Sequence, residues 1–446
     1  METARAARDA RAKALLASLR RCDEELRVGT LKIIEVVGDP WQRSELFGWV
    51  EHEHSGRLLE RREAALFGAG WQLEKHLQLQ LMRPDAGDFT VLIARPLHLA
   101  GKLPAALLMH ATGKCKEFMA NRLEQWARKG LIAVAFDAPW HGERALPEAG
   151  LSKSGGQSNS GTCDLSLKSL GPELLRTLQR HETARLDVYF KALIAGWRTA
   201  SDRFVLDIVR DALTVVDYLC ARPDVLPERI GAAGVSLGGM ACWLLAAADT
   251  RICSAMPAIG VQSFNHSLRN GLWGARVDSI RPAFEAAAAD LKKDSVDDDV
   301  VAAVWSRLAP GIAEVDPSNP LAFDAPLTLP CIAPRHLLVL NGEKDPRCPL
   351  EGVQKCIAAA KQAYEQEGKP EHFKIFIEKD VEHAMTDKMW EKIESFLEVS
   401  LGLPTTSKLY PELCGIPVRN VLCVELLKRL QPYSWCCIAP ALSVQG

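Results

Sequence analysis

The residues most suited to chemistry form a glycine-bounded serine motif. Residues 234–238 read Gly-Val-Ser-Leu-Gly, with Ser236 at the centre. At ordinary glycine and serine contents, a chain this long contains one such motif by chance roughly one time in seven. The setting adds specificity, because an apolar run (230–235) precedes the serine and a helix-length stretch (237–248) follows it. This predicts a tight strand–turn–helix that presents a nucleophilic hydroxyl; the competing interpretation is an ordinary N-cap serine.

A serine hydroxyl is a weak nucleophile and needs a base within hydrogen-bond reach. Two later loops supply partners in the order Ser, acid, His: Asp345 follows the apolar run 336–340, and His383 follows the run 373–378. We expect His383 to take the serine proton and Asp345 to fix the tautomer of the imidazole. Alternatives stay open, because Glu343 or Asp380 could be the third member, Asp345 a solvated turn acid, and His383 a surface residue.

Acyl transfer also needs two amide donors for the developing oxyanion. The amide of Leu237, directly after the serine, is the first candidate. The second is expected after the apolar run 105–109, where Thr112 is favoured and Ala111 is the alternative. A phosphate-binding loop around the Gly-Lys pair at 113–114 is excluded, because the earlier glycine is absent and Cys115 replaces the Ser or Thr that binds magnesium.

Other polar clusters predict little chemistry. His141 lies in a Pro/Gly-containing turn, where a structural role is favoured over lining a pocket. His52 and His54 do not form an H-E-x-x-H pattern. The acids at 297–299 lack the glycine and the terminal glutamate of a calcium loop, which favours a solvated helix start. We expect no metal and no cofactor.

The elements that must position these residues alternate between strand and helix. Residues 72–82 and 89–94 have the alternating pattern of an antiparallel strand pair. Helix-length amphipathic segments separate the later apolar runs, which predicts an α/β fold with a mostly parallel central sheet and helices on both faces. Residues 144–202 and 262–330 interrupt this pattern, with helices expected near 282–292 and 297–308. They form either a cap over the site or peripheral packing.

Composition is that of an ordinary globular protein. The chain has 446 residues, 48% of them apolar and 25% charged, and a formal net charge of −2. Nothing in this balance favours binding to nucleic acid or to an anionic membrane. No apolar run reaches the roughly 18 residues of a membrane span. The 13 cysteines include no C-x-x-C pair, and they are predicted to be free thiols.

An N-terminal segment precedes the region in which strands and helices alternate, and a C-terminal tail follows it. Residues 1–21 predict an amphipathic helix without the features of a secretory signal, and their acids and low serine content disfavour an organelle transit peptide, so cytosol is the default. We predict an N-terminal helical extension (1–70), a hydrolase domain (71–404) and a tail outside the core (405–446).

Several motifs together resemble a known family. Residues 110–117, 140–144, 234–240, 247–251 and 341–349 are similar to a plant and algal subgroup of α/β-hydrolases related to dienelactone hydrolase, acetyl xylan esterases and the catalytic domain of S9 prolyl oligopeptidases. The resemblance covers about residues 70–400. It implies an α/β-hydrolase fold and a triad of Ser236, Asp345 and His383. Dienelactone hydrolase uses a cysteine nucleophile, so Ser236 points away from that activity, and Ala111 replaces the family's usual glycine.

The sequence therefore predicts a serine hydrolase that cleaves a small-molecule carboxylic ester through an acyl-enzyme. The first rival is a serine peptidase or amidase of the S9 type, which loses support because no propeller-like repeat precedes the domain. The second rival is a non-catalytic binding protein with a hydrolase fold. The oligomeric state stays open.

Overall fold

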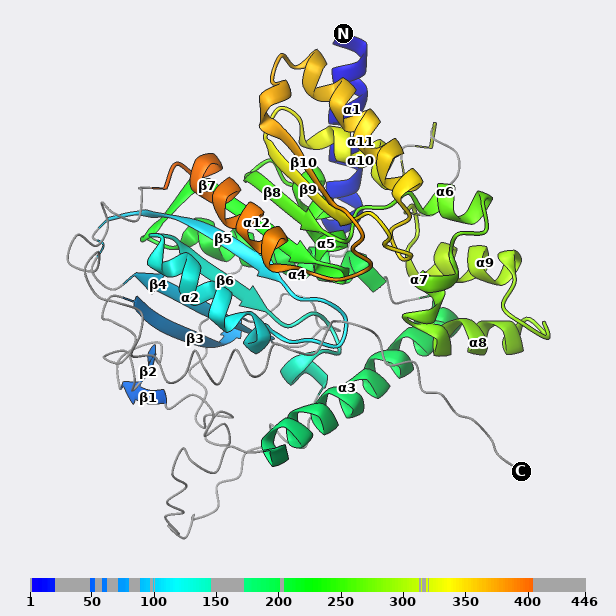
Figure 1. The fold of residues 1–446 in the computed structure, drawn as a ribbon, viewed down its shortest axis with the longest axis horizontal. Helices are drawn as coiled ribbons and strands as arrows, with labels where there is room; N and C mark the ends of the chain where they lie inside the picture. The colour runs from blue at the N-terminus through cyan, green and yellow to red at the C-terminus, as the bar shows by residue number, and fades with distance from the viewer. Residues whose placement is uncertain are drawn as a thin grey trace.

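The computed structural model describes residues 2–20, 49–52, 58–61, 71–79, 89–96, 99, 101–145, 172–200, 204–312, 314, 318–319 and 321–403. An eight-stranded sheet forms its centre (Figure 1). Its strands, in spatial order, are β3 (Trp71–Leu79), β4 (Phe89–Pro96), β6 (Ile132–Phe136), β5 (Leu103–Met109), β7 (Val225–Val235), β8 (Ile252–Ala258), β9 (His336–Gly342) and β10 (Phe373–Glu378).

Only β4 runs against both of its neighbours, β3 and β6, and the other pairs in this sheet are parallel. Two short strands, β1 (Trp49–His52) and β2 (Leu58–Arg61), form a separate antiparallel pair. The predicted mostly parallel sheet is confirmed, as is the antiparallel pair expected at its start.

Alternate residues of the central strands enter two different hydrophobic cores. In β5, Leu107 belongs to one core and Leu108 to the other, and both side chains are fully buried. In β6, Val134 and Ala135 divide in the same way. When both faces of a strand are buried, the side chains on both faces are apolar, and this explains why these strands are unbroken apolar runs in the sequence.

Helices cover both faces of the sheet, as predicted (Figure 1). One core includes side chains of α1 (Glu2–Arg20), α4 (Phe204–Ala221), α5 (Leu237–Ala248) and α11 (Leu350–Gln366). The opposite core includes side chains of α2 (Ala120–Arg128) and α12 (Asp387–Ser400).

The helix predicted at the N-terminus is α1, and it packs on the main hydrophobic core. Leu15 and Leu19 are fully buried in the core that α4 and α5 share. The guanidinium of Arg210 in α4 donates to the carbonyl oxygen of Leu19 at 2.9 Å. The domain boundary at residue 70 stays a prediction, and the tail (405–446) lies outside the described residues.

The two insertions pack against each other. The first contains α3 (Pro172–Thr199), preceded by the short η3 (Gly142–Ala145); its Gly/Ser-rich loop, 152–161, lies outside the described residues. In the second, Asp290 accepts from the indole N–H of Trp197 in α3 at 3.0 Å. The helices of the second are α6 (Phe264–Arg269), α7 (Gly274–Asp278), α8 (Arg281–Asp290), α9 (Asp298–Leu308), α10 (Ala325–Thr328) and the short η6 (Leu329–Ile332).

The helices expected near 282–292 and 297–308 are thus confirmed as α8 and α9. Whether the insertions act as a cap stays a prediction. Among the helices that the structure describes, none combines the length and apolar character needed to cross a bilayer.

Candidate active site

Ser236 occupies the predicted turn between β7 and α5. Its backbone has φ 54° and ψ −108°. Residues other than glycine rarely adopt this conformation. The amide of Ser236 donates to Ala258 of β8 at 2.9 Å, and its carbonyl oxygen accepts from Met240 of α5 at 2.9 Å. The neighbouring strand and the following helix therefore hold the serine in its strained turn.

The two glycines of the motif permit close backbone contacts around this turn. A Cβ atom at Gly234 would overlap the carbonyl group of Gly238, and a Cβ atom at Gly238 would overlap the carbonyl group of Met109 at the end of β5. The second contact brings the turn after β5 against the N-terminus of α5. Neither position can accept a side chain unless the backbone moves.

We predict that Gly234→Ala lowers the free energy of unfolding by about 3 kcal/mol, because the overlap is with backbone atoms that cannot rotate away. Gly274→Ala is the matched control, since a Cβ atom there has no neighbour within 4 Å. Its effect is expected to stay within about 0.5–1 kcal/mol. Urea unfolding measures both. Equal stabilities of the two variants would contradict the steric argument.

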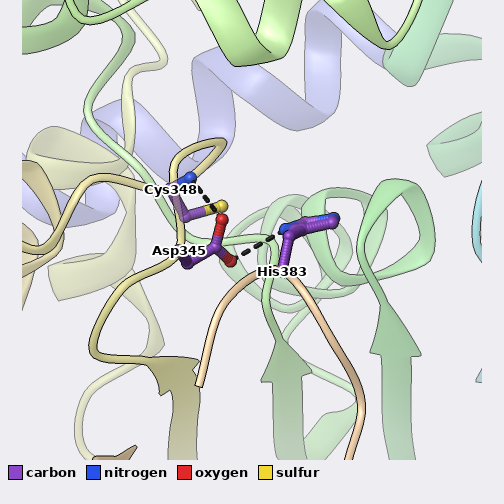
Figure 2. Close-up of side chains that lie close together, drawn as sticks. All are labelled: Asp345, Cys348 and His383. Carbon is purple, nitrogen blue, oxygen red and sulfur yellow. Dashed lines mark hydrogen bonds and ion pairs between the residues drawn. The ribbon is translucent and has the colours of Figure 1, made fainter. Parts of the chain in front are cut away.

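The structure brings together the three residues that the sequence analysis selected. Ser236 Oγ lies 2.8 Å from Nε2 of His383, and Nδ1 of His383 lies 2.8 Å from Oδ2 of Asp345. Asp345 follows β9 and His383 follows β10, so both lie in loops at the carboxyl ends of parallel strands (Figure 2). With the proton of the neutral ring on Nδ1, facing the carboxylate, Nε2 is free to accept from the serine hydroxyl.

Hydrogen bonds fix Asp345 from its other side. Its Oδ1 accepts from the backbone amides of Arg347 at 2.8 Å and Cys348 at 3.0 Å. Burial opposes ionisation of Asp345, but the hydrogen bond and positive charge of His383 and the amide of Cys348 outweigh it, and the pKa of the carboxyl group is lowered. Asp345 is therefore a carboxylate at neutral pH.

Burial also lowers the pKa of His383 from its ordinary value of 6.5, and the hydrogen bond to Asp345 opposes that shift. The imidazole is therefore neutral at pH 7, which is the form that can accept a proton.

The two alternative acids are engaged elsewhere. Glu343 accepts from the backbone amide of Asp380 at 3.0 Å, and the Asp380 carboxylate pairs with Lys344 at 2.6 Å. The described contacts of His383 thus favour Asp345 as the orienting acid.

The candidate oxyanion donors lie in the expected places. Leu237 is the first residue of α5, so its amide is among those with no acceptor inside the helix. Thr112 and Ala111 lie in the turn after β5, which the Gly238 contact places beside α5. The amide that completes an oxyanion hole, Thr112 or Ala111, stays a prediction.

Buried polar contacts that the sequence analysis missed hold this turn. Lys116 donates from its backbone amide and from Nζ to the two carboxylate oxygens of Asp137, at 2.9 and 2.6 Å, and both side chains are fully buried. Nε2 of His110 accepts from the amide of Ala138 at 2.9 Å. These contacts fasten the turn after β5 to the one after β6.

His141 lies in the second of these turns. Its Nδ1 lies 2.8 Å from the carbonyl oxygen of Pro139, and burial lowers the pKa of the ring to about 3. The ring is therefore neutral. These contacts agree with the structural role that the sequence analysis favoured.

Three potential metal-binding side chains gather beside the serine: Asp345, Cys348 and His383 have ligand atoms within 4.8 Å of one another (Figure 2). The Cys348 thiol donates to the carbonyl oxygen of Ile259 at 3.4 Å, and burial raises its pKa well above the usual range. Metal ions bind the thiolate, whereas this sulfur is held protonated. The group fits an acid–base pair with a neighbouring thiol better than a metal site.

The sheet order, with one antiparallel strand near an edge and a serine turn after a central parallel strand, defines an α/β-hydrolase fold. The model of the Alpha/beta hydrolase family matches residues 106–393. The chain belongs to that family. The narrower plant and algal subgroup stays a prediction.

Individual known proteins match this chain either over a short segment or at low sequence identity. A 45-residue segment is 47% identical to YtaP of Bacillus subtilis (strain 168), a protein named as a hydrolase; it covers 10% of this chain and 15% of YtaP. A solved 2,6-dihydroxy-pseudo-oxynicotine hydrolase is 17% identical, with a TM-score of 0.46, over 74% of this chain and 69% of that one. An acetyl xylan esterase from Paenibacillus sp. R4 is 18% identical, with a TM-score of 0.45, over 74% of this chain and 84% of that one.

Proposed function

We propose that the chain is a serine hydrolase that cleaves carboxylic esters of small molecules. The observation that supports this most directly is the continuous hydrogen-bonded chain from Ser236 through His383 to Asp345. Three loops far apart in the sequence contribute these side chains, and a purely structural cluster has no need for this order of hydroxyl, imidazole and carboxylate.

In the proposed reaction, Ser236 Oγ attacks the ester carbonyl carbon while Nε2 of His383 takes the hydroxyl proton. The amides of Leu237 and Thr112 stabilise the oxyanion of the tetrahedral intermediate. His383 then returns the proton to the departing alkoxide as the carbon–oxygen bond breaks. Water then attacks the acyl carbon while the same nitrogen takes its proton, and His383 returns that proton to Ser236 Oγ as the bond from Oγ to the acyl carbon breaks and the acid is released. Asp345 stabilises the imidazolium that forms twice in each cycle.

An ester is favoured over a peptide, because two helical insertions flank the site and suit a small acyl compound better than an extended chain. A peptidase or amidase with the same three residues is the alternative that shares this chemistry. A non-catalytic binding protein with the same fold is the alternative that has no hydrolytic chemistry.

The test compares p-nitrophenyl esters of graded acyl length with peptide p-nitroanilides. We expect kcat/KM for the best ester to exceed kcat/KM for the best anilide by at least about 100-fold. Comparable values would favour the peptidase. Failure to hydrolyse any of these substrates, together with failure to react with a fluorophosphonate probe, would favour the binding protein.

A further inference from the structure

The second insertion contacts the loop that carries Asp345. Nη2 of Arg276 in α7 donates to the carbonyl oxygen of Arg347 and to the sulfur of Cys348, both at 3.3 Å. With the side-chain amide of Gln262 oriented to satisfy both of its neighbours, its oxygen accepts from Nε of Arg276 at 3.1 Å and its nitrogen donates to the Arg347 oxygen at 2.6 Å. Two side chains of the insertion therefore meet at one carbonyl group of this loop.

The two loop residues that Arg276 contacts are the same two whose backbone amides hold the Asp345 carboxylate. The amides of Arg347 and Cys348 donate to Oδ1 of Asp345 at 2.8 and 3.0 Å. The carbonyl group of Arg347 and the amide of Cys348 belong to one planar, trans peptide unit, so the C=O and N–H bonds of this unit point in opposite directions. Hydrogen bonds that fix its oxygen on the side of the insertion therefore direct its N–H group toward Asp345.

These groups are shielded from water. Arg276 is 5% exposed, Gln262 and Asp345 are each 2% exposed, and Cys348 is fully buried. When one partner of a buried hydrogen bond is removed, bulk water does not replace it, and the other partner is left unpaired. The loop should therefore respond strongly to the loss of either insertion side chain.

The charge of Arg276 acts in the same direction as its hydrogen bonds. Burial opposes ionisation of Asp345, but the pKa of its carboxyl group is lowered by His383, by the amide of Cys348 and by the positive charge of Arg276. Burial lowers the pKa of His383, and the charge of Arg276 lowers it further. Arg276 thus favours a carboxylate beside a neutral imidazole, which is the resting state that a general base requires.

We propose that Arg276 and Gln262 are positioning residues for the orienting acid. They hold the 347–348 peptide unit so that the Asp345 carboxylate stays in contact with His383. The inference rests on the proposed function, and it assigns a part of the second insertion to the support of the triad. Both side chains act through Asp345 rather than on the reacting atoms.

The first test measures kcat and KM for the best p-nitrophenyl ester. We expect Arg276→Met to lower kcat by about 30-fold and Gln262→Met to lower it by about tenfold, because methionine keeps a similar length and removes the hydrogen bonds. KM should change by less than about twofold.

A double-mutant cycle shows whether the loss passes through Asp345. In the Asp345→Asn background, Arg276→Met should lower kcat by no more than about threefold further, since the group that Arg276 positions is already lost. The same factor in both backgrounds would overturn the proposal. Should Arg276→Met fail to fold, Gln262→Met takes its place in the cycle, because it leaves the charge of Arg276 in the protein.

Arg335→Met is the matched control. Arg335 also donates to backbone carbonyl oxygens, among them those of Ala246 and Ile252, each at 2.7 Å. It directly precedes β9, however, whereas Asp345 follows the opposite end of that strand. Arg335→Met should lower the midpoint of urea unfolding and leave kcat unchanged in both backgrounds.

A spectroscopic measurement separates this inference from the proposed reaction. The proton between Nδ1 of His383 and Asp345 should give a downfield ¹H NMR resonance, which is identified by its loss in Asp345→Asn and in His383→Gln. Gln262→Met and Arg276→Met should broaden this resonance or shift it upfield, and Arg335→Met should leave it unchanged.

This signature needs no substrate. A resonance that responds as expected in a protein that hydrolyses no ester would refute the proposed reaction alone. An active enzyme in which Arg276→Met and Gln262→Met change neither the resonance nor kcat would refute the positioning role alone.

Discussion

Ser236→Ala is expected to lower kcat for ester hydrolysis by about 10⁵-fold or more, because no other group at the turn can form the acyl-enzyme. The variant should fold, since the hydrogen bonds that hold this turn come from the backbone of Ser236. It should also lose covalent labelling by a fluorophosphonate probe, and mass spectrometry of the wild type should place the label on Ser236.

Ser254→Ala is the matched control for this experiment. Ser254 lies on β8, is fully buried, and shares a 2.8 Å hydrogen bond with the Ser400 hydroxyl. Its loss should cost about 1 kcal/mol of stability and leave labelling intact. Labelling of Ser236→Ala to the wild-type level would rule out Ser236 as the nucleophile.

The sequence predicts the serine turn well because its constraints are local. The strand before Ser236, the helix after it and the two flanking glycines are contiguous in the sequence, and each contributes a pattern that can be recognised. The places of Asp345 and His383 follow from a topological rule, since loops at the carboxyl ends of parallel strands meet at one edge of the sheet.

The contacts that the sequence did not predict join residues with no shared local pattern. Lys116 begins a short 3₁₀ helix and Asp137 follows a strand, and only the pairing of β5 with β6 brings them together. Trp197 and Asp290 belong to separate insertions, and no periodicity in the sequence specifies the packing that joins them. The oxyanion donor is harder still to predict from the sequence. A backbone amide is present at every position of the turn, and only the direction of the N–H group distinguishes Thr112 from Ala111.

The N-terminal helix shows the same limit. Its apolar stripe predicts an amphipathic helix, and the structure contains that helix as α1. The stripe does not specify a partner, so it does not predict that Leu15 and Leu19 enter the main core. Helix type is a local property, whereas docking depends on the complementary surface of α4 and α5.

Asp345→Asn is expected to lower kcat by about 10⁴-fold, although the side chain keeps nearly the same shape. The amide oxygen can still accept from Arg347 and Cys348, so the loop should keep its structure. The NH₂ group would then face Nδ1 of His383 and hold the ring in the tautomer with its proton on Nε2, which cannot accept from Ser236. The loss of the carboxylate also removes the stabilisation of the imidazolium.

The pH profile of kcat/KM provides an independent measurement. The wild type should lose activity as pH falls through an apparent pKa below 6.5, because burial lowers the pKa of His383 and the base must be neutral. The Asp345 carboxylate raises that pKa, so Asp345→Asn should move the midpoint of this acid limb to still lower pH while its plateau falls. Asp380→Asn changes an exposed acid that pairs with Lys344, and it should alter neither the midpoint of the acid limb nor the plateau of kcat/KM. A small loss in Asp345→Asn combined with a large loss in Asp380→Asn would instead assign the orienting role to Asp380.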